Sequence, residues 1–242
     1  MTIDPFHFHP ELRDQIACSE SSFFRDFSLE RVLKEHPELQ AIQEVALSDA
    51  ERDAIRLPLL ADHSGDLWIF AYGSLMWDPA LRFREVRRAH APGHARRFIL
   101  RENKGGRGTA DAPGLMAALD KGDGCDGLVF RIAAAEVEQE TTILFRRELV
   151  APGYHAVFIP VDIEGARISA LTFVANHDWP DILGAIDRDV QVRWIATGEG
   201  ILGSSRDYLD QTLSQLERLG LRDDACSALK AEVDAYVAAT TK

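Results

Sequence analysis

Strand-like segments follow one another through the middle of this chain, and helical segments gather at its end. The segments predicted as strands are residues 67–72, 96–101, 114–119, 127–132, 154–161 and 167–175. The segments predicted as helices are residues 134–149, 181–197, 205–219 and 224–239. Only the first helix interrupts the strands, whereas repeated βαβ units would alternate throughout. This order predicts an α+β fold with a mostly antiparallel sheet or barrel.

The first 65 residues differ in character from the rest. They begin irregular and rich in His and Phe, then become helix-like, with Pro37 and Pro58 as breaks. The stretch HSGD at residues 63–66 separates them from the first clear strand. We therefore expect a partly helical N-terminal extension over residues 1–65 and one domain over residues 66–242.

The composition and net charge of the chain argue against some classes of binding partner. The chain has 46% hydrophobic and 27% charged residues, as ordinary globular proteins do, and a net charge of -12. Nucleic-acid binding depends on clustered Lys and Arg, so this charge argues against a nucleic-acid partner. No apolar run approaches the length of a membrane span, and the first residues lack a secretory pattern. We expect no membrane partner and a cytoplasmic location.

The cysteines and the histidine pair give no metal site. Cys18, Cys125 and Cys226 are far apart and show no CxxC spacing, so reduced thiols are expected. His7 and His9 are spaced as ligands could be, but no Cys or Asp cluster lies near them in sequence. An incidental surface pair is the favoured interpretation, and no metal or cofactor is predicted.

The stretch GEGILG at residues 198–203 matches the dinucleotide pattern GxGxxG. That fingerprint requires a strand before the first glycine, whereas residues 187–197 read as a helix. We interpret the stretch as a glycine-rich connector between two helices.

The stretch FAYGSLMWD at residues 70–78 runs from a buried strand into a turn at Tyr72, Gly73 and Ser74. A glycine there lets another group approach the backbone, and successive N–H groups of such a turn can face an anion or an oxyanion. The alternative is a strand end whose glycine serves only the turn.

A carboxylate interrupts the apolar stripe of the helix at residues 134–149. Val137, Thr141 and Leu144 recur at helical spacing, and the next member of the stripe is Glu148. Neither burial nor the dipole at a helix C-terminus favours a negative charge there. A general base is one explanation, because burial would raise the carboxyl pKa; a salt bridge with an arginine such as Arg147 is the other.

Four blocks of the sequence together resemble the ChaC-type γ-glutamylcyclotransferase family. They are WIFAYGSLMWDPAL, GRGTADAPGLMAAL, LFRRELVAPGYH and GSSRDYLDQTLSQLERLGLRDD, in the family's order and within about residues 67–239. Ala71 stands where family members usually have glycine, which alters packing but leaves the Tyr-Gly-Ser-Leu core intact. The extension lies outside this resemblance.

The resemblance implies a small mixed β-barrel with flanking helices and a substrate, glutathione, that is cleaved to 5-oxoproline and Cys-Gly. It implies that Tyr72, Gly73, Ser74 and Leu75 hold the γ-glutamyl group through their backbone. It assigns Glu148 as the catalytic glutamate.

Tyr208 would contact the substrate on the same grounds. The alternatives are the same cyclisation on other γ-glutamyl peptides or amines, and a non-catalytic regulator of cation transport. The retained Glu148 favours the enzyme, and the oligomeric state is left open.

Overall fold

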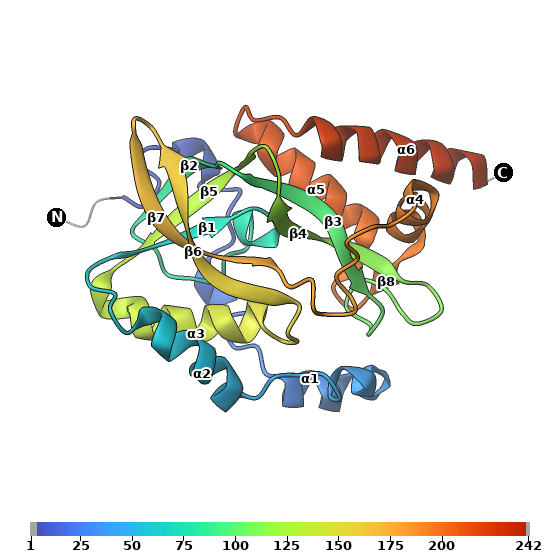
Figure 1. The fold of residues 1–242 in the computed structure, drawn as a ribbon, viewed down its shortest axis with the longest axis horizontal. Helices are drawn as coiled ribbons and strands as arrows, with labels where there is room; N and C mark the ends of the chain where they lie inside the picture. The colour runs from blue at the N-terminus through green and yellow to red at the C-terminus, as the bar shows by residue number, and fades with distance from the viewer. Residues whose placement is uncertain (1–3, 241–242) are drawn as a thin grey trace.

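A small closed barrel forms the centre of the protein (Figure 1). The computed structural model describes residues 4–240, and within them the barrel strands are β1 Leu67–Ala71, β5 Cys125–Ile132, β2 Glu85–Ala91, β6 Tyr154–Ile163 and β7 Ala166–Ala175. Antiparallel pairings join these strands in that order, and a parallel pairing of Ile69 with Leu171 closes the ring. The predicted mixed α+β barrel is confirmed.

Two further strands extend the sheet beyond the barrel. They are β3 His94–Glu102 and β4 Gly114–Lys121, which pair antiparallel with each other. The parallel pairing of Leu119 with Val174 attaches β4 to β7. A separate short hairpin is formed by β8 Glu199–Gly200 and β9 Gly203–Ser204.

Helices cover the barrel on opposite sides (Figure 1). They are α1 Leu29–Glu35, α2 Asp49–Leu60, α3 Val137–Glu148, α4 Arg188–Thr197, α5 Ser205–Arg218 and α6 Asp224–Thr240. The 3₁₀ turns are η1 Pro10–Leu12, η2 Ser19–Ser21, η3 Pro37–Ile42, η4 Ser74–Met76 and η5 Ala134–Glu136. α2 packs on α3, whereas α4, α5 and α6 pack on one another, and α4 and α5 also contact β4. Across residues 4–240, no helix combines the length and apolar character needed to span a bilayer.

The sequence-based prediction missed β2 and the short strands β8 and β9, and it placed the start of α4 wrongly. β2 was missed because its apolar residues are few and small, with Arg87 and Arg88 between them. α4 begins at Arg188 and not at residue 181. The segment before α4 instead runs beside β3, where the Arg101 amide donates to the Asp181 carbonyl at 2.7 Å. Pairing with a distant strand thus overrides the local helical pattern.

The N-terminal segment covers the part of β2 that does not pair with β6. β2 meets β6 at one residue pair, His90 with Asp162, so part of the β2 edge needs other partners. The Val86 amide donates to the Pro5 carbonyl at 3.1 Å, and the Arg88 amide donates to His9 Nε2 at 3.2 Å. His9 is therefore a buried structural residue, and the interpretation of an incidental surface pair was wrong for it.

The same segment contributes to the hydrophobic core. Leu12 and Ile16 are buried in one cluster with barrel residues such as Ile69 and Phe130. Residues of this segment and of the barrel thus share one core and stabilise each other.

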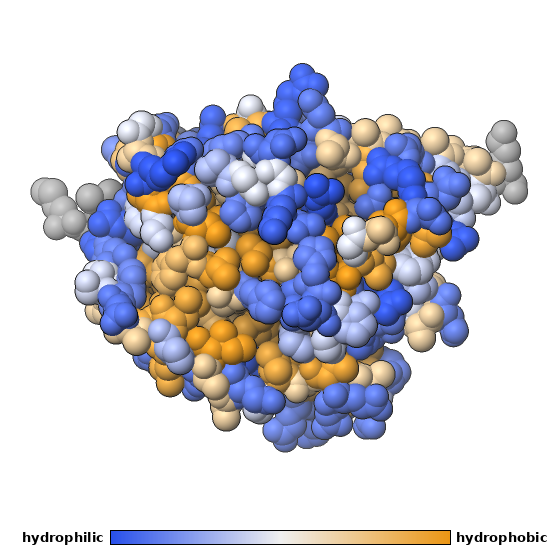
Figure 2. Space-filling view, viewed as in Figure 1, coloured by the Kyte–Doolittle hydropathy of each residue, from blue (hydrophilic) through white to orange (hydrophobic). Residues whose placement is uncertain are grey.

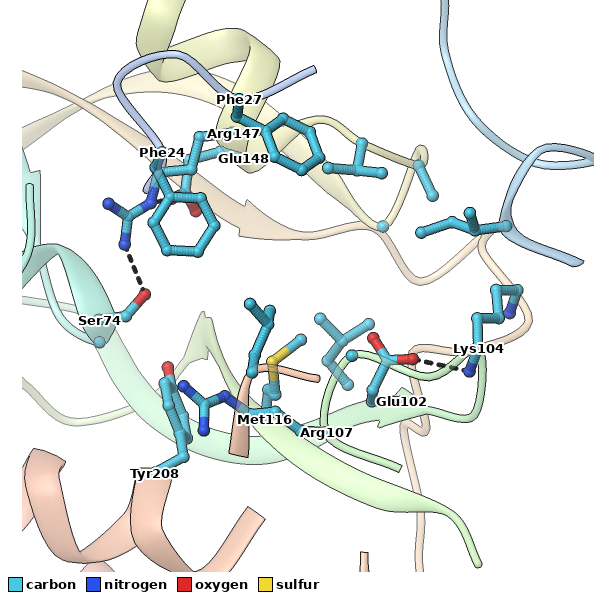
Figure 3. A pocket seen from close by; sticks show the side chains of 18 of the residues that line it. Phe24, Phe27, Ser74, Glu102, Lys104, Arg107, Met116, Arg147, Glu148 and Tyr208 are labelled. Atoms are coloured by element: carbon cyan, nitrogen blue, oxygen red, sulfur yellow. Dashed lines mark hydrogen bonds and ion pairs between the residues drawn. The ribbon is translucent and has the colours of Figure 1, made fainter. Parts of the chain in front are cut away.

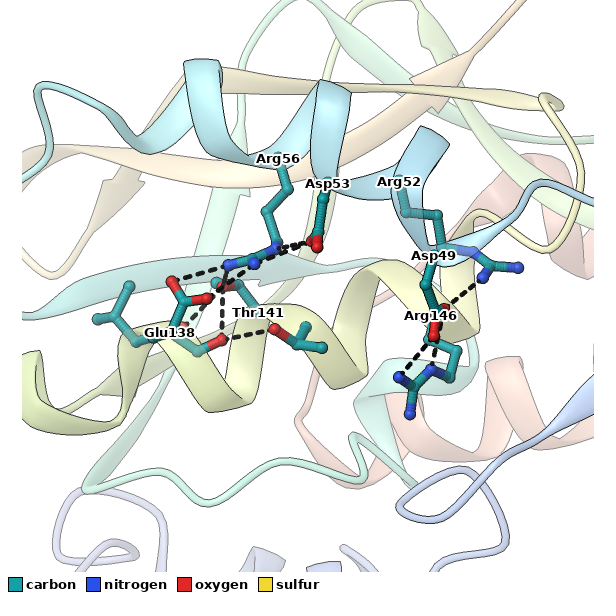
Figure 4. A network of polar contacts seen from close by, with 9 residues as sticks. Asp49, Arg52, Asp53, Arg56, Glu138, Thr141 and Arg146 are labelled. Carbon is teal, nitrogen blue, oxygen red and sulfur yellow. Dashed lines mark hydrogen bonds and ion pairs between the residues drawn. The ribbon is translucent and has the colours of Figure 1, made fainter.

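α2 holds α3 through a network of ion pairs (Figure 4). Arg56 binds Glu138 at 2.8 Å and Thr141 at 3.2 Å, although the Arg56 side chain is only 3% exposed. Arg52 donates to the carbonyl of Leu149, just beyond the last residue of α3. A cation at a helix C-terminus satisfies a free carbonyl and complements the helix dipole. Ile55 and Leu57 of α2 are exposed, and Figure 2 shows hydrophobic residues gathered in the region where Figure 1 draws α2.

A buried ion pair fastens the N-terminal segment to α3 and to the loop after β1. Arg25 Nη2 donates to Glu140 Oε1 at 2.8 Å, and the Glu140 side chain has no solvent exposure. Arg25 also donates to the carbonyl of Ala80, the one non-glycine residue with positive φ among residues 4–240. The Arg82 amide donates to Glu140 Oε2 at 2.9 Å. These contacts fix the loop conformation that follows β1.

We expect Arg25→Ala to lower the free energy of unfolding by about 3–5 kcal/mol, because it leaves the Glu140 carboxylate buried without its cation. Chemical denaturation measures the change. Arg167→Ala is the control, since it removes an exposed ion pair with Asp162 and should cost below about 1 kcal/mol. The double variant Arg25→Met with Glu140→Leu should recover part of the loss. A loss in Arg25→Ala no larger than in the control would contradict this account.

Candidate active site

One pocket of about 560 Å³ contains every predicted site residue (Figure 3). The loop after β1 contributes Tyr72 to Leu75, the end of α3 contributes Glu148, and α5 contributes Tyr208. These elements are far apart in sequence and meet in the fold, where α5 contacts the 3₁₀ turn η4 of the loop and Arg147 of α3 donates to Ser74. The structure thus brings all these residues to one cavity.

Gly73 allows the loop to approach α5 closely. A Cβ atom built on Gly73 would overlap the hydroxyl oxygen of Tyr208, so no larger residue fits without a shift. Tyr208 lies on the buried face of α5, whose N-cap Ser204 accepts a hydrogen bond from the Asp207 amide. The glycine of the loop therefore serves a close approach as well as the turn.

Glu148 is the last residue of α3 and lies at the pocket wall. Its side chain is 15% exposed, and burial raises the pKa of its carboxyl above the usual value. Arg147 opposes this rise, because its Nε lies 3.0 Å from Glu148 Oε1. The salt bridge foreseen as an alternative is present, and the carboxylate also faces the cavity. The two explanations of Glu148 are thus compatible.

Arg147 joins the carboxylate to the loop. Its side chain is 3% exposed; Nη2 donates to Ser74 Oγ at 2.9 Å, and Nη1 donates to the Asp78 carbonyl. The guanidinium lies over the ring of Phe24, 4.2 Å from its centroid, which is a cation–π contact. The Arg147 side chain therefore fixes the position of Glu148 relative to Ser74.

Three phenols line the pocket. Burial raises the pKa of Tyr208 to about 12, with the Arg107 cation opposing the rise, and it raises the pKa values of Tyr72 and Tyr154 well above normal. Tyr72 donates to the Phe173 carbonyl at 2.9 Å, and Tyr154 donates to the Ala117 carbonyl at 3.0 Å. At neutral pH all three are neutral hydrogen-bond donors.

Sequence reasoning missed further residues that line the pocket. Arg107 and Met116 come from the β3–β4 region, across the pocket from Glu148, whereas Phe24 and Phe27 come from the N-terminal segment and lie on the side of Glu148 (Figure 3). Arg107 and Met116 lie within the matched block GRGTADAPGLMAAL, and Tyr154 lies within LFRRELVAPGYH, so the blocks contained a signal for them. No local pattern marked the two phenylalanines, because their role depends on how the extension folds over the barrel.

Comparison with solved structures identifies the fold. A crystal structure of a yeast γ-glutamyl cyclotransferase specific to glutathione superposes with a TM-score of 0.65. The match has 20% sequence identity and covers 72% of this chain and 97% of that one. The barrel and its helices therefore have the fold of γ-glutamylcyclotransferases.

Sequence comparison gives the family. The family model described as ChaC-like protein matches residues 67–236. A glutathione-specific γ-glutamylcyclotransferase of Escherichia coli K12 is 35% identical over 82% of this chain and 87% of its own length. One from Schizosaccharomyces pombe is 30% identical over 70% of this chain and 93% of its own. This chain belongs to the ChaC-like family.

The Escherichia coli alignment is longer than the family match. It covers more of this chain than residues 67–242 make up, so it includes part of the N-terminal segment. That segment is thus shared in part with at least this relative.

We expect Gly73→Ala to destabilise the fold by about 1–3 kcal/mol, because the added methyl group meets the Tyr208 hydroxyl. Tyr208→Phe removes that oxygen and leaves the ring carbon beneath it at 3.6 Å from the new Cβ, an ordinary contact. The double variant should therefore be more stable than the sum of the single changes predicts. Thermal or chemical unfolding of all four proteins measures this coupling. Strict additivity would show that the two residues do not meet.

Proposed function

We propose that this chain is a glutathione-specific γ-glutamylcyclotransferase, a lyase that converts glutathione into 5-oxoproline and Cys-Gly. The observation that carries the proposal is the Glu148 carboxylate, which has a raised pKa and lies in one pocket with the loop of Tyr72 to Leu75. The names of the relatives support the choice of substrate. The cytoplasmic location predicted from the sequence would keep the substrate thiol reduced.

The reaction needs no nucleophile from the enzyme. The α-amino nitrogen of the γ-glutamyl group attacks its own γ-carbonyl carbon, and a five-membered lactam forms as the bond to the cysteinyl nitrogen breaks. Because both groups belong to one molecule, holding the chain folded supplies the proximity. The enzyme must accept a proton from the attacking ammonium and return one to the leaving amine.

Glu148 performs both proton transfers in this proposal. As a carboxylate it accepts the proton of the α-ammonium, and as a carboxylic acid it donates that proton to the cysteinyl nitrogen. A raised pKa brings the two forms closer in free energy at neutral pH, which suits both steps. Arg147 keeps the carboxylate oriented and limits the rise of its pKa.

The loop of Tyr72 to Leu75 holds the γ-glutamyl group in this proposal. Its backbone N–H groups would bind the substrate or the negative charge that develops on the γ-carbonyl oxygen. The neutral Tyr208 hydroxyl lies directly against this loop and is a further donor. The cavity volume falls within the usual range for a small-molecule site.

The decisive assay measures 5-oxoproline released from glutathione by the purified protein and by Glu148→Gln. We expect the wild-type chain to be active and the variant to lose kcat by about 10²- to 10⁴-fold, because an amide cannot accept the ammonium proton. Glutathione should still bind, since the loop is unchanged. Stability should hold, because the glutamine oxygen can still accept from Arg147.

Glu138→Gln is the matched control on the same helix. It removes a carboxylate whose side chain is 76% exposed, so kcat should stay unchanged. A well-folded Glu148→Gln protein with near-normal kcat would exclude the mechanism. Equal turnover of glutathione and γ-glutamyl-alanine by the wild-type chain would favour the broader alternative, and no turnover of either would favour a binding protein.

The pH profile of kcat/KM is a further prediction. A base must be deprotonated to act, so activity should fall by about tenfold per pH unit below the pKa of Glu148. Because burial raises that pKa, the midpoint of the acidic limb should lie above the ordinary glutamate value of 4.5. The residual activity of Glu148→Gln should lack this limb. A midpoint at or below 4.5 in the wild-type chain would contradict the assignment.

A further inference from the structure

The glycine-rich stretch at residues 198–203 supports the loop between β3 and β4. The Ile201 amide donates to the Gly105 carbonyl and the Leu202 amide donates to the Gly106 carbonyl, both at 2.9 Å. A Cβ atom on Gly200 would overlap the Gly105 carbonyl oxygen, so the two backbones touch. The β8–β9 hairpin therefore fixes the loop from which Arg107 projects.

Arg107 is itself fastened to the start of α5. Its Nη1 donates to the Ser204 carbonyl at 3.1 Å, and its own carbonyl accepts from Ser205 Oγ at 3.1 Å. Its guanidinium carbon lies 5.0 Å from the centroid of the Tyr208 ring. The position of this cation relative to Tyr208 is thus set by backbone and side chain together.

The charge of Arg107 has no ion-pair partner among residues 4–240. The other lysine and arginine side chains of the pocket are paired: Arg101 and Lys104 with Asp181, and Arg147 with Glu148. Burial lowers the pKa of Arg107, although the carboxylates of Asp207 and Glu102 act against this at a distance. A partly buried cation without a close anion costs free energy, and such local costs concentrate at functional sites.

The donors of Arg107 are mostly unused. A guanidinium has five N–H donors in a planar fork that matches a carboxylate, and one hydrogen bond from the Arg107 side chain is formed within the described residues. The side chain lines the pocket on the wall opposite Glu148 (Figure 3). A carboxylate of the bound molecule would complete this part of the site.

We propose that Arg107 binds the glycyl carboxylate of glutathione and thereby makes the site select γ-glutamyl peptides with a terminal carboxylate. This assignment rests on the proposed function, which places the γ-glutamyl end of the substrate at Glu148 and the loop of Tyr72 to Leu75. Arg107 lies beside Tyr208 and across the pocket from Glu148, where it can bind the second carboxylate of the substrate. Substrates that lack this carboxylate leave the guanidinium unpaired and bind more weakly.

The test compares glutathione with γ-glutamylcysteinyl-glycinamide, whose terminal carboxylate is replaced by a neutral amide. In the wild-type chain, kcat/KM for glutathione should be higher by roughly 10- to 100-fold, the usual range for a hydrogen-bonded charge. In Arg107→Met the ratio should fall to about one, through KM for glutathione and with kcat retained. Arg107→Lys should keep part of the preference.

The control is Arg97→Met on β3, where an exposed guanidinium is removed and the preference should stay as in the wild-type chain. Calorimetric binding of both compounds to Glu148→Gln, with and without Arg107→Met, repeats the comparison without turnover. This separates the inference from the proposed function, because binding preference is measured even in an inactive protein. Two outcomes would overturn the inference. Arg107→Met could leave the kcat/KM ratio of the two compounds unchanged, or it could weaken the calorimetric binding of both compounds by the same factor.

Discussion

The buried ion pair of Arg25 and Glu140 is the contact on which the rest of the structure depends. Glu140 has no solvent exposure, so its charge is compatible with folding only where Arg25 and the Arg82 amide meet it. This requirement places the N-terminal segment against α3 and fixes the loop after β1 through the Ala80 carbonyl. The same segment then presents Phe24 to the pocket. Its structural and functional contributions follow from one geometric constraint.

The pocket combines one carboxylate that can change its protonation state, Glu148, with two arginines that stay charged, Arg147 and Arg107. Glu148 is partly desolvated, which raises its pKa, and Arg147 limits the rise while binding Ser74. The phenol of Tyr208 stays neutral because it is buried. Arg107 supplies a positive charge on the opposite wall. A zwitterionic substrate with an anionic end would match this distribution, and a proton could move at one end without disturbing the other.

Local patterns in the sequence pointed to two features that line the pocket, and the family resemblance added Leu75 and Tyr208. The turn at Gly73 and the interrupted stripe ending at Glu148 were visible because each depends on neighbours within a few residues. The α+β order followed from the succession of strands and helices. The strand β2 was missed because its inward residues are small and separated by arginines. The start of α4 was misplaced because residues near Asp181 pair with β3, which local propensity does not report.

The sequence by itself determined the class of fold, the glutamate and the glycine loop, because helical and strand periodicity and turn chemistry act over short distances. Only the tertiary structure decided which charged side chains form ion pairs. Arg147 has an ion-pair partner and Arg107 has none within residues 4–240, although both are arginines in matched blocks, because pairing depends on where side chains lie after folding. It also decided that the N-terminal segment lines the pocket. Long-range packing and the desolvation of charge are properties of the assembled fold, and no short stretch of sequence contains them.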